Sequence, residues 1–295
     1  MKPGTVLFEI DHGRHSIRKL VASVARAFRK RKLRKIARAH IKSGSKQVAI
    51  FAFDDMGIDI NEDGFFDREE LEALIMWLDR RKDEMAASSA IDAGANIGNH
   101  SLYFSQFFRR VHAFEPNPRT FKVLSINAEL ADNITCYDCA LSDKSSEGFL
   151  EIDATHTGGA HIGSSGSSIA LQTLDNILDP SERIFLYKID VEGHEYEALT
   201  GSEQTIRRNK PLILFEQLPI EIENGTSRTI ELLKSYGYSN FAVMGRYPYI
   251  YDQWPDLVRG GIEVLTKLFV GAQTKLVTVS SFRRTYYSMI VALPD

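Results

Sequence analysis

A glycine-rich turn between two apolar segments most constrains how this chain folds. Residues Ile91–Ala93 read as the end of a buried strand, and Gly94–Gly98 as a tight turn that leads into a helix. The next apolar run, Val111–Glu115, ends in a carboxylate. An acid at this distance from a glycine turn suits the ribose hydroxyls of a nucleotide-like cofactor. Because the spacing is GxxxG rather than GxGxxG, no pyrophosphate cradle is evident, and the pattern favours S-adenosylmethionine (SAM) over NAD.

A second acidic segment follows a later apolar run. Residues Ile184–Tyr187 are apolar, and Lys188–Glu195 read KIDVEGHE before a helical pattern. Four motifs now stand in order: DAGANIGNHS from Asp92, HAFEPNP from His112, ALSD from Ala140 and KIDVEGHE from Lys188. With these motifs the stretch Ser88–Gln217 resembles the FkbM family of SAM-dependent methyltransferases, and the resemblance continues more weakly toward the C-terminus.

The resemblance implies a fold class and a division of the chain. It implies an α/β fold of the class I (Rossmann-like) methyltransferases, with a mostly parallel seven-stranded sheet, an antiparallel last strand and an N-terminal helical and β extension. We expect residues 1–87 to form the extension and residues 88–295 the methyltransferase domain. The segment 246–284 is expected to be an insert that caps the acceptor, because long inserts at such positions are usually functional.

Apolar runs and helical patterns alternate regularly from Ala90 onward, as in parallel α/β sheets. Strands are expected at Ala90–Ala93, Arg110–Glu115, Ile134–Cys139, Ile184–Asp190 and Leu212–Glu216. Helices are expected at Asn99–Phe108, Pro118–Leu130, Glu195–Arg208 and Thr226–Tyr236. An added hairpin is expected from Gly148–Ile152 and Ser168–Thr173, with a mobile tip at Thr157–Ser167. The closing strands, Asn240–Met244 and Tyr286–Leu293, would form an antiparallel pair at the sheet edge in this family's fold.

Successive strand ends carry groups suited to the cofactor, and ligands bind beyond the carboxyl ends of strands in open α/β sheets. The residues expected to contact SAM are Asp92, Gly94, Asn96, Gly98, Glu115, Cys139 and Ala140. The first four would line the methionine end and the turn beneath it. Glu115 would accept from both ribose hydroxyls, and Cys139 and Ala140 would flank the adenine. The plainer alternative makes Asp92 a helix cap and Glu115 a surface acid.

The acidic segment after the fourth strand is expected to serve the methyl acceptor. The candidates for catalysis are Lys188, Asp190, Glu192, His194 and Glu216. A hydroxyl acceptor has a high pKa, so a base or a metal helps to remove its proton. His194 has a suitable unperturbed pKa for a base. Asp190 and Glu192 could instead hold the acceptor or bind a divalent cation, although no metal ligands are assigned. Lys188 could pair with one of these carboxylates.

The N-terminal region is strongly basic. Between Arg14 and Lys46 there are 13 Lys and Arg residues and no acid. Helical spacing runs over Ser16–Ile41, with one apolar stripe before the cluster Arg29–Lys32, a second stripe after it, and a break expected at the cluster. Three interpretations remain open: an amphipathic helix packed on the catalytic domain, a helix at an anionic membrane surface, and a nucleic-acid-binding segment. The third is disfavoured because aromatic residues for base stacking are nearly absent.

A calcium-loop pattern lies in the same extension. Residues Asp59–Glu70 fit D-x-[DN]-x-[DN]-G-x5-E. An EF-hand needs an entering helix, whereas Val48–Phe53 and Gly57–Ile60 read as strands, and there is no second copy to pair with. A helix is expected at Asp67–Lys82. We therefore interpret the motif as an acidic turn that does not bind calcium.

The resemblance implies an O-methyltransferase that acts on a hydroxyl of a glycan or of a specialised metabolite, and the basic N-terminal face would suit a lipid-linked saccharide. The alternatives are an RNA or protein methyltransferase and a non-catalytic SAM-binding module. No apolar run reaches the ~18 residues of a membrane span, no signal-peptide pattern begins the chain, and Cys136 and Cys139 read as reduced thiols. A cytoplasmic location is expected, with contact to the inner membrane surface through the basic helix as one of the open interpretations, and the sequence predicts no oligomeric state.

Overall fold

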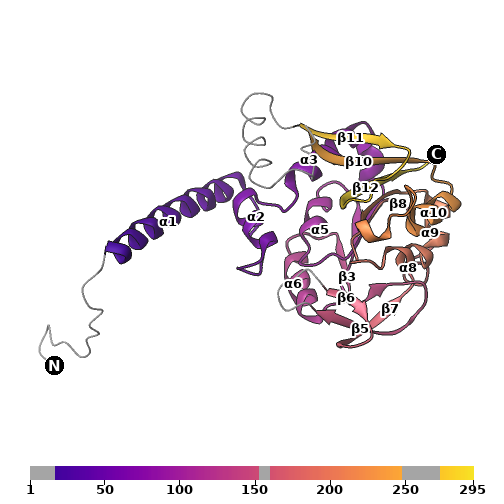
Figure 1. Cartoon of the computed structure of the whole chain (residues 1–295), viewed down its shortest axis with the longest axis horizontal. Coiled ribbons are helices and arrows are strands. Elements are labelled where there is room, and N and C mark those ends of the chain that lie inside the picture. Colours follow the sequence, from indigo (N-terminus) through magenta and orange to yellow (C-terminus); the bar gives the residue numbers. More distant parts are fainter. Residues whose placement is uncertain (1–16, 153–159, 248–272) are drawn as a thin grey trace, which may run out of the picture.

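An eight-stranded sheet forms the centre of the molecule (Figure 1). The structure is a computed structural model that describes residues 17–152, 160–247 and 273–295. Its strands are β1 (Ser89–Ala93), β2 (Arg110–Phe114), β3 (Ile134–Tyr137), β8 (Ile184–Ile189), β9 (Leu212–Gln217), β10 (Asn240–Tyr247), β11 (Gln273–Val279) and β12 (Tyr287–Leu293). They lie in the order β11-β10-β12-β9-β8-β1-β2-β3. The five strands from β3 to β9 are parallel, and β12 is inserted antiparallel between β9 and β10.

This strand order is the α/β sheet of class I (Rossmann-like) methyltransferases, as predicted. Two details differ from the sequence-based expectation. The sheet has eight strands rather than seven, because β11, from the segment predicted as an insert, pairs antiparallel with β10. The closing strands are therefore not at the edge: β11 is the edge strand, and β12 lies inside the sheet. Residues 248–272 of the predicted cap lie outside the described residues.

Helices on both faces bury the parallel strands, which explains why these strands are continuous apolar runs. The helices that follow the strands are α5 (Asn99–Phe104), α6 (Pro118–Ala128), α7 (Leu174–Ile177), α8 (Glu195–Thr200), α9 (Glu203–Asn209) and α10 (Arg228–Ser235), with the 3₁₀ turn η2 (Pro219–Glu221). The helix predicted over Glu195–Arg208 is broken into α8 and α9. A Cβ on Gly201, between them, would lie 1.9 Å from the carbonyl oxygen of Ser142, so the chain turns there on a close backbone contact.

The predicted hairpin is part of a second, four-stranded sheet. This sheet consists of β4 (Ala140–Leu141), β5 (Ser146–Ile152), β6 (Ala160–Gly163) and β7 (Ser167–Gln172), in the order β4-β7-β5-β6. Part of the segment predicted as a mobile tip is instead strand β6, which pairs antiparallel with β5. Residues 157–159 of that tip lie outside the described residues.

The N-terminal extension is helical, and the strands predicted there are absent from residues 17–88. Its elements are α1 (Ile17–Ser43), α2 (Asp55–Asp63), α3 (Arg68–Leu78), η1 (Asp79–Arg81) and α4 (Lys82–Ala86). Asp54 caps α2 by accepting from the backbone N–H of Met56. The apolar run before α2 is held by a side chain rather than by a strand: Asn127 bonds both the N–H and the carbonyl of Ala49, at 2.7 and 2.9 Å.

The segment that matches the calcium-loop pattern therefore begins in a helix, whereas a strand and an acidic turn were expected. Asp59, Asn61 and Asp63 belong to helix α2, which ends at Gly64 in the left-handed region. The first three ligand positions thus lie within a helix, and the predicted entering strand is wrong. That the loop does not bind calcium stays a prediction, which a melting-temperature titration with calcium would test.

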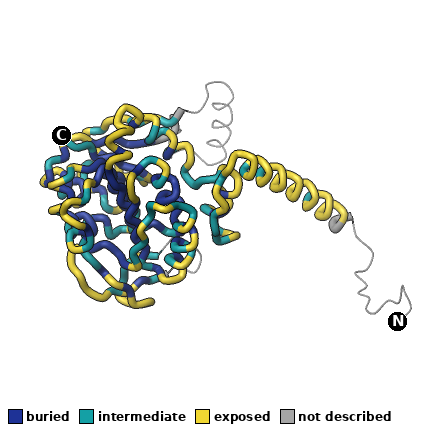
Figure 2. Tube along the Cα trace, turned by 180° about the vertical axis from the view of Figure 1, so that it is seen from behind, coloured by how far each residue is buried: buried dark blue, intermediate teal, exposed yellow. Residues whose placement is uncertain are grey.

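Helix α1 is continuous through the basic cluster and projects away from the body (Figures 1 and 2). The break predicted at Arg29–Lys32 is wrong. Leu20, Val21, Val24 and Phe28 are all exposed, so this stripe is not packed on the catalytic domain as one interpretation expected. Within the described ranges, no helix is both long enough and apolar enough to cross a bilayer.

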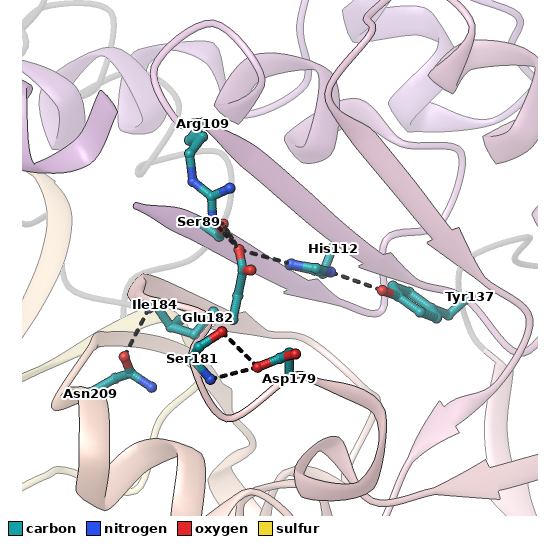
Figure 3. A network of polar contacts seen from close by, with 9 residues as sticks. All are labelled: Ser89, Arg109, His112, Tyr137, Asp179, Ser181, Glu182, Ile184 and Asn209. Carbon is teal, nitrogen blue, oxygen red and sulfur yellow. Dashed lines mark hydrogen bonds and ion pairs between the residues drawn. The ribbon is translucent and has the colours of Figure 1, made fainter. Parts of the chain in front are cut away.

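A polar network ties the first three strands together (Figure 3). The carboxylate of Glu182, just before β8, accepts from Ser89 and from Arg109 Nη2, the latter at 2.6 Å. The ring of His112 on β2 lies 3.6 Å from Glu182 and 3.0 Å from the hydroxyl of Tyr137 on β3. Tyr137 in turn stacks on Phe114, with ring centroids 4.5 Å apart. The network fixes the strands whose carboxyl ends bear the candidate site.

Candidate functional site

A cavity of about 230 Å³ opens at the carboxyl ends of β1, β2, β8 and β9. This is the edge of a parallel sheet where ligands are expected. Of the predicted site residues, those that line the cavity are Gly94, Asn96, Glu115, Ala140, Lys188, Asp190, Glu192 and Glu216. Most of the predicted cofactor and acceptor residues are thus brought together in one cavity.

The glycine turn forms the floor of the cavity. The N–H groups of Gly94 and Ala95 both donate to the carbonyl of Phe114, and Gly94, Asn96 and Gly98 all have positive φ. A Cβ on Gly94 would lie 1.7 Å from the carbonyl oxygen of Asp190, so only glycine lets the ends of β1 and β8 approach this closely. Gly98 does not line the cavity; its hydrogen faces Leu124 of α6, where a Cβ would come within 2.8 Å.

Glu115 is fixed in the cavity by the backbone. Its Oε2 accepts from the N–H of Asn96 at 2.9 Å, and its Oε1 from the N–H of Asn117 at 2.8 Å. Burial raises the pKa of Glu115 to about 7, against the opposing effect of the two N–H groups. Each carboxylate oxygen keeps a further lone pair. The group is therefore oriented to accept hydrogen bonds from a ligand with hydroxyls, which would also favour its ionised form.

Asp92 lies beneath the turn rather than on the cavity surface. It is fully buried, accepts from Ser101 Oγ at 2.6 Å and lies 3.1 Å from Lys188 Nζ. The same ammonium lies 3.4 Å from Asp190 and 3.5 Å from the carbonyl of Gly94. Burial lowers the pKa of Lys188, but the two carboxylates outweigh it and raise the pKa above its usual value. Lys188 is a charged link between the floor and the acidic end of the cavity.

The acidic end of the cavity contains three carboxyl groups, from Asp190, Glu192 and Glu216, with oxygens within 4.8 Å of one another. Burial and the charge of Asp190 raise the pKa of Glu216 to about 8, although Tyr286 donates a hydrogen bond to it. Burial also raises the pKa of Asp190, but Lys188 and the hydrogen bond from Glu216 hold it below its usual value. At neutral pH Glu216 thus carries a proton, and Asp190 is ionised.

Besides Asp92 and Gly98, two more predicted residues, His194 and Cys139, lie outside the cavity lining. The ring of His194 is held by Ser142 Oγ at 2.9 Å and lies 3.6 Å from Glu197. Cys139 is buried, and the adjacent wall is formed by Ala140 and Leu141. Neither residue is positioned at the cavity surface for the role that the sequence suggested.

The sequence reading also missed residues that line the cavity. They are Met56, Phe66, Asn99, His100, Phe114, Leu141, Leu150, Ala160, Ile162 and Tyr286, among others. His100 belongs to the motif DAGANIGNHS, and a polar ring in the first turn of the helix after the glycine turn could have indicated a site residue. Met56 and Phe66 belong to the extension, and no local pattern in the sequence connects them to the glycine turn.

The strand order and the cavity over the glycine turn define a class I methyltransferase. The sequence profile described as the methyltransferase FkbM domain matches residues 92–239, half of the chain. The protein therefore belongs to the FkbM methyltransferase family, as the motifs predicted.

Individual relatives match shorter stretches. The chain is 33% identical to "Hexuronic acid methyltransferase AglP" of Haloferax volcanii over 39% of this chain and 50% of that protein. It is 30% identical to "Methyltransferase sdnD" of Sordaria araneosa over 39% of this chain and 60% of that protein. The match thus spans about half to three fifths of these curated relatives. A crystal structure of methyltransferase FkbM from Methylobacillus flagellatus KT is 21% identical, with a TM-score of 0.35, over 44% of this chain and 33% of that one.

Proposed function

We propose that the protein transfers a methyl group from SAM to a hydroxyl of a sugar or of a specialised metabolite. The observation that carries the proposal is the fixed carboxylate of Glu115 beside the glycine turn, in the same cavity as an acidic group suited to a hydroxyl acceptor. The names of two relatives, a hexuronic acid methyltransferase and a second methyltransferase, support this direction. Hexuronic acids are therefore the first class of acceptor to test as substrates.

The residues of the cavity fit the chemical groups of SAM. The turn Gly94–Gly98 would hold the methionine end, Glu115 the two ribose hydroxyls, and the apolar wall of Phe114, Ala140 and Leu141 the adenine. When bound, SAM supplies an electrophilic methyl group on a sulfonium, and the protein contributes position and electrostatics. The ionised Asp190 places a negative charge at the acidic end of this cavity, where the acceptor would bind.

Asp190, Glu192 and Glu216 would bind the acceptor. Because Lys188 and Glu216 hold Asp190 in its ionised form, this carboxylate can accept a hydrogen bond from an acceptor hydroxyl next to the reacting one and so orient the acceptor. The protonated Glu216 stabilises Asp190 through their shared hydrogen bond. A divalent cation among the three carboxylates is the alternative way to bind the acceptor oxygen, since hard cations prefer oxygen ligands.

The test is a search for acceptor-dependent turnover. The purified protein is incubated with SAM and, separately, with uronic acid glycosides, neutral hexose glycosides and tRNA, and S-adenosylhomocysteine is measured by mass spectrometry. We expect product with a sugar acceptor and with none of the acceptor-free controls. Product with tRNA instead would support an RNA methyltransferase. SAM binding by calorimetry without turnover on any acceptor would support a non-catalytic module.

We also propose that helix α1 binds the surface of an anionic membrane and places the enzyme there as a peripheral cytoplasmic protein. Two apolar stripes lie on nearly opposite faces of α1, because residues advance by 100° along a helix. The C-terminal stripe, Leu33, Ala37 and Ile41, lines a groove against the following chain and Ile60 of α2. In this half Lys32 also pairs with Glu62, and His40 Nε2 lies 3.1 Å from the carbonyl oxygen of Glu62.

Side chains of both stripes are exposed, but those of the N-terminal stripe lie outside this groove. Val24 is 49% and Phe28 67% exposed, and the opposite side of the same turns carries Arg26, Arg29 and Lys30. An apolar face beside a cationic face is the pattern of a helix that lies in the headgroup region of a membrane. Such a location would bring the active site to a lipid-linked acceptor.

A further inference from the structure

His100 is a buried imidazole in the cavity that the roles above do not use. It lies in the first turn of α5, is 7% exposed and lines the cavity beside the acidic end. Within the described residues no hydrogen bond reaches either ring nitrogen, and Asp67 Oδ2 lies 3.8 Å from Nε2. Buried polar groups are normally hydrogen-bonded, so an unbonded imidazole at a cavity surface points to a partner that the ligand supplies.

Asp67 comes from the N-terminal extension and is placed toward this ring. It occupies the N-cap of α3, where an aspartate usually accepts from the first turn of the helix. Its side chain makes no such capping bond, and its φ of 54° is unusual for a residue other than glycine. The segment is held in place by Asn99, which accepts from the N–H of Phe66 and donates to its carbonyl, at 3.0 and 3.1 Å. The fold thus keeps a carboxylate beside His100 at the expense of a helix cap.

The other groups of the cavity are less available to accept a proton. Both oxygens of Glu115 are bonded to backbone N–H groups. Asp190 is held by Lys188 and by Glu216, and Glu216 is itself protonated. His100 faces the charges of Lys188, Asp92 and Asp190 as well as Asp67; burial, then Lys188, lower its pKa to about 4, so it is neutral at neutral pH. A neutral imidazole is the form that accepts a proton.

We propose that His100 receives the proton of the acceptor hydroxyl and that Asp67 orients the ring for this step. The inference rests on the proposed O-methyltransferase function. As the acceptor oxygen bonds to the methyl carbon, the electron pair of the broken carbon–sulfur bond stays on sulfur, and the hydroxyl proton moves to Nδ1 of His100. The imidazolium that forms has the Asp67 carboxylate facing Nε2, at a distance that can shorten when substrates bind.

The proposal extends the catalytic unit beyond the family domain. The profile match begins at residue 92, whereas Asp67 precedes it and Met56 and Phe66 also line the cavity. The α2–α3 segment then serves the acceptor end of the site and is not only a support for the sheet. Relatives without an equivalent of Asp67 would need another way to orient a proton acceptor.

The kinetic test uses p-nitrophenyl β-D-glucuronide as the probe acceptor. In His100→Ala we expect kcat to fall about 100-fold, as for loss of a general base, with SAM affinity by calorimetry unchanged. Added imidazole should restore the rate in proportion to its concentration, which a purely structural role would not allow. Asp67→Asn should lower kcat with little change in KM, whereas Asp63→Asn, an exposed neighbour on α2, should match wild type. Unchanged kcat in His100→Ala, or loss of SAM affinity without imidazole rescue, overturns the proposal.

A second measurement needs no acceptor. Nitrogen-15 NMR of the histidine rings at neutral pH reports which ring nitrogen carries the proton. We expect the Nε2–H tautomer for His100, with a bare Nδ1, and a mixture of tautomers in Asp67→Asn. If wild-type His100 is the Nδ1–H tautomer, or if its tautomer does not change in Asp67→Asn, the pairing of His100 with Asp67 is overturned. If wild type fails to methylate the probe, the proposed substrate class fails, while this measurement still decides the role of Asp67.

Discussion

The ammonium nitrogen of Lys188 lies 3.1 Å from Oδ1 of the fully buried Asp92. The two residues are register partners on neighbouring strands, β8 and β1. Their pair lies directly beneath the glycine turn, because Lys188 also reaches the carbonyl of Gly94. Two residues that the sequence assigned to catalysis and to cofactor contact therefore form a charged pair that supports the glycine turn from beneath.

Lys188→Met should destabilise the protein strongly. Removing one member of a buried ion pair leaves the other charge uncompensated, which costs about 3–5 kcal/mol. The measurement is urea unfolding of both proteins at neutral pH. Lys234→Met is the matched control, since its partner Glu231 is exposed and solvent screens such a pair, so little stability should be lost. Equal midpoints for the two variants would show that Lys188 is not a structural charge.

Glu115→Ala should weaken SAM binding at least tenfold. The variant removes an acceptor for two ribose hydroxyls, and a hydrogen bond to a charged group contributes about 1.5–3 kcal/mol. Calorimetry measures the affinity, with circular dichroism to check folding because the side chain also bonds Asn96 and Asn117. The exposed Glu147→Ala is the control. Wild-type affinity in a folded Glu115→Ala protein would remove the ribose assignment.

Asp190→Asn should leave SAM affinity largely intact and abolish turnover with the probe glycoside, because the amide cannot replace the negative charge at the acceptor end. Chelation separates the two ways of binding the acceptor. If a cation joins Asp190, Glu192 and Glu216, EDTA will inhibit wild type, and Mg²⁺ or Mn²⁺ will restore it. Full activity after exhaustive chelation excludes the cation, and an active Asp190→Asn enzyme excludes the residue from the mechanism.

Glu216 should make the protein less stable as pH rises. Its pKa is raised from 4.5 to about 8, so the folded protein keeps a proton that the unfolded chain releases between these values. Stability from this group is complete below the unfolded pKa and is lost as pH rises toward the folded pKa. Glu216→Gln, which mimics the protonated form, should remove this part of the decline. Melting temperatures of both proteins across this pH range provide the measurement, and parallel curves would contradict the assignment.

The sequence was most informative where chemistry and backbone constraints are local. The apolar runs at Ala90–Ala93 and Leu212–Glu216 became β1 and β9 within a residue, because each is a buried strand bounded by a turn. The cofactor turn was recognisable because its glycines and Glu115 lie close together in the sequence.

Features that depend on distant contacts were not predictable. Val48–Phe53 has the composition of a strand, but its backbone at Ala49 is bonded by Asn127, 78 residues away. The break between α8 and α9 depends on the approach of Gly201 to Ser142. His194 follows the fourth predicted strand, where a catalytic base was expected, yet it is His100 that lines the cavity. Only the tertiary fold decides which of the two rings faces the cavity.

Helix α1 should bind vesicles of phosphatidylglycerol and phosphatidylcholine and should not bind phosphatidylcholine alone. The expected binding combines burial of the Val24 and Phe28 face with attraction of the basic residues to anionic headgroups, about 1 kcal/mol for each cation near the surface. Flotation of the full chain on a density gradient measures it. Raising the salt concentration should weaken the binding, because the electrostatic part is screened.

A pair of charge-matched variants identifies the face of α1 that binds. Val24→Glu with Phe28→Glu places two acids in the exposed apolar stripe, whereas Ala22→Glu with Ser23→Glu places the same two charges on the opposite, basic side. Both lower the net charge equally, so a purely electrostatic contact would suffer equally in both. We expect the first double variant to lose flotation and the second to retain much of it. Equal losses in both variants, together with a salt-dependent gel shift of tRNA, would instead assign the helix to nucleic acid.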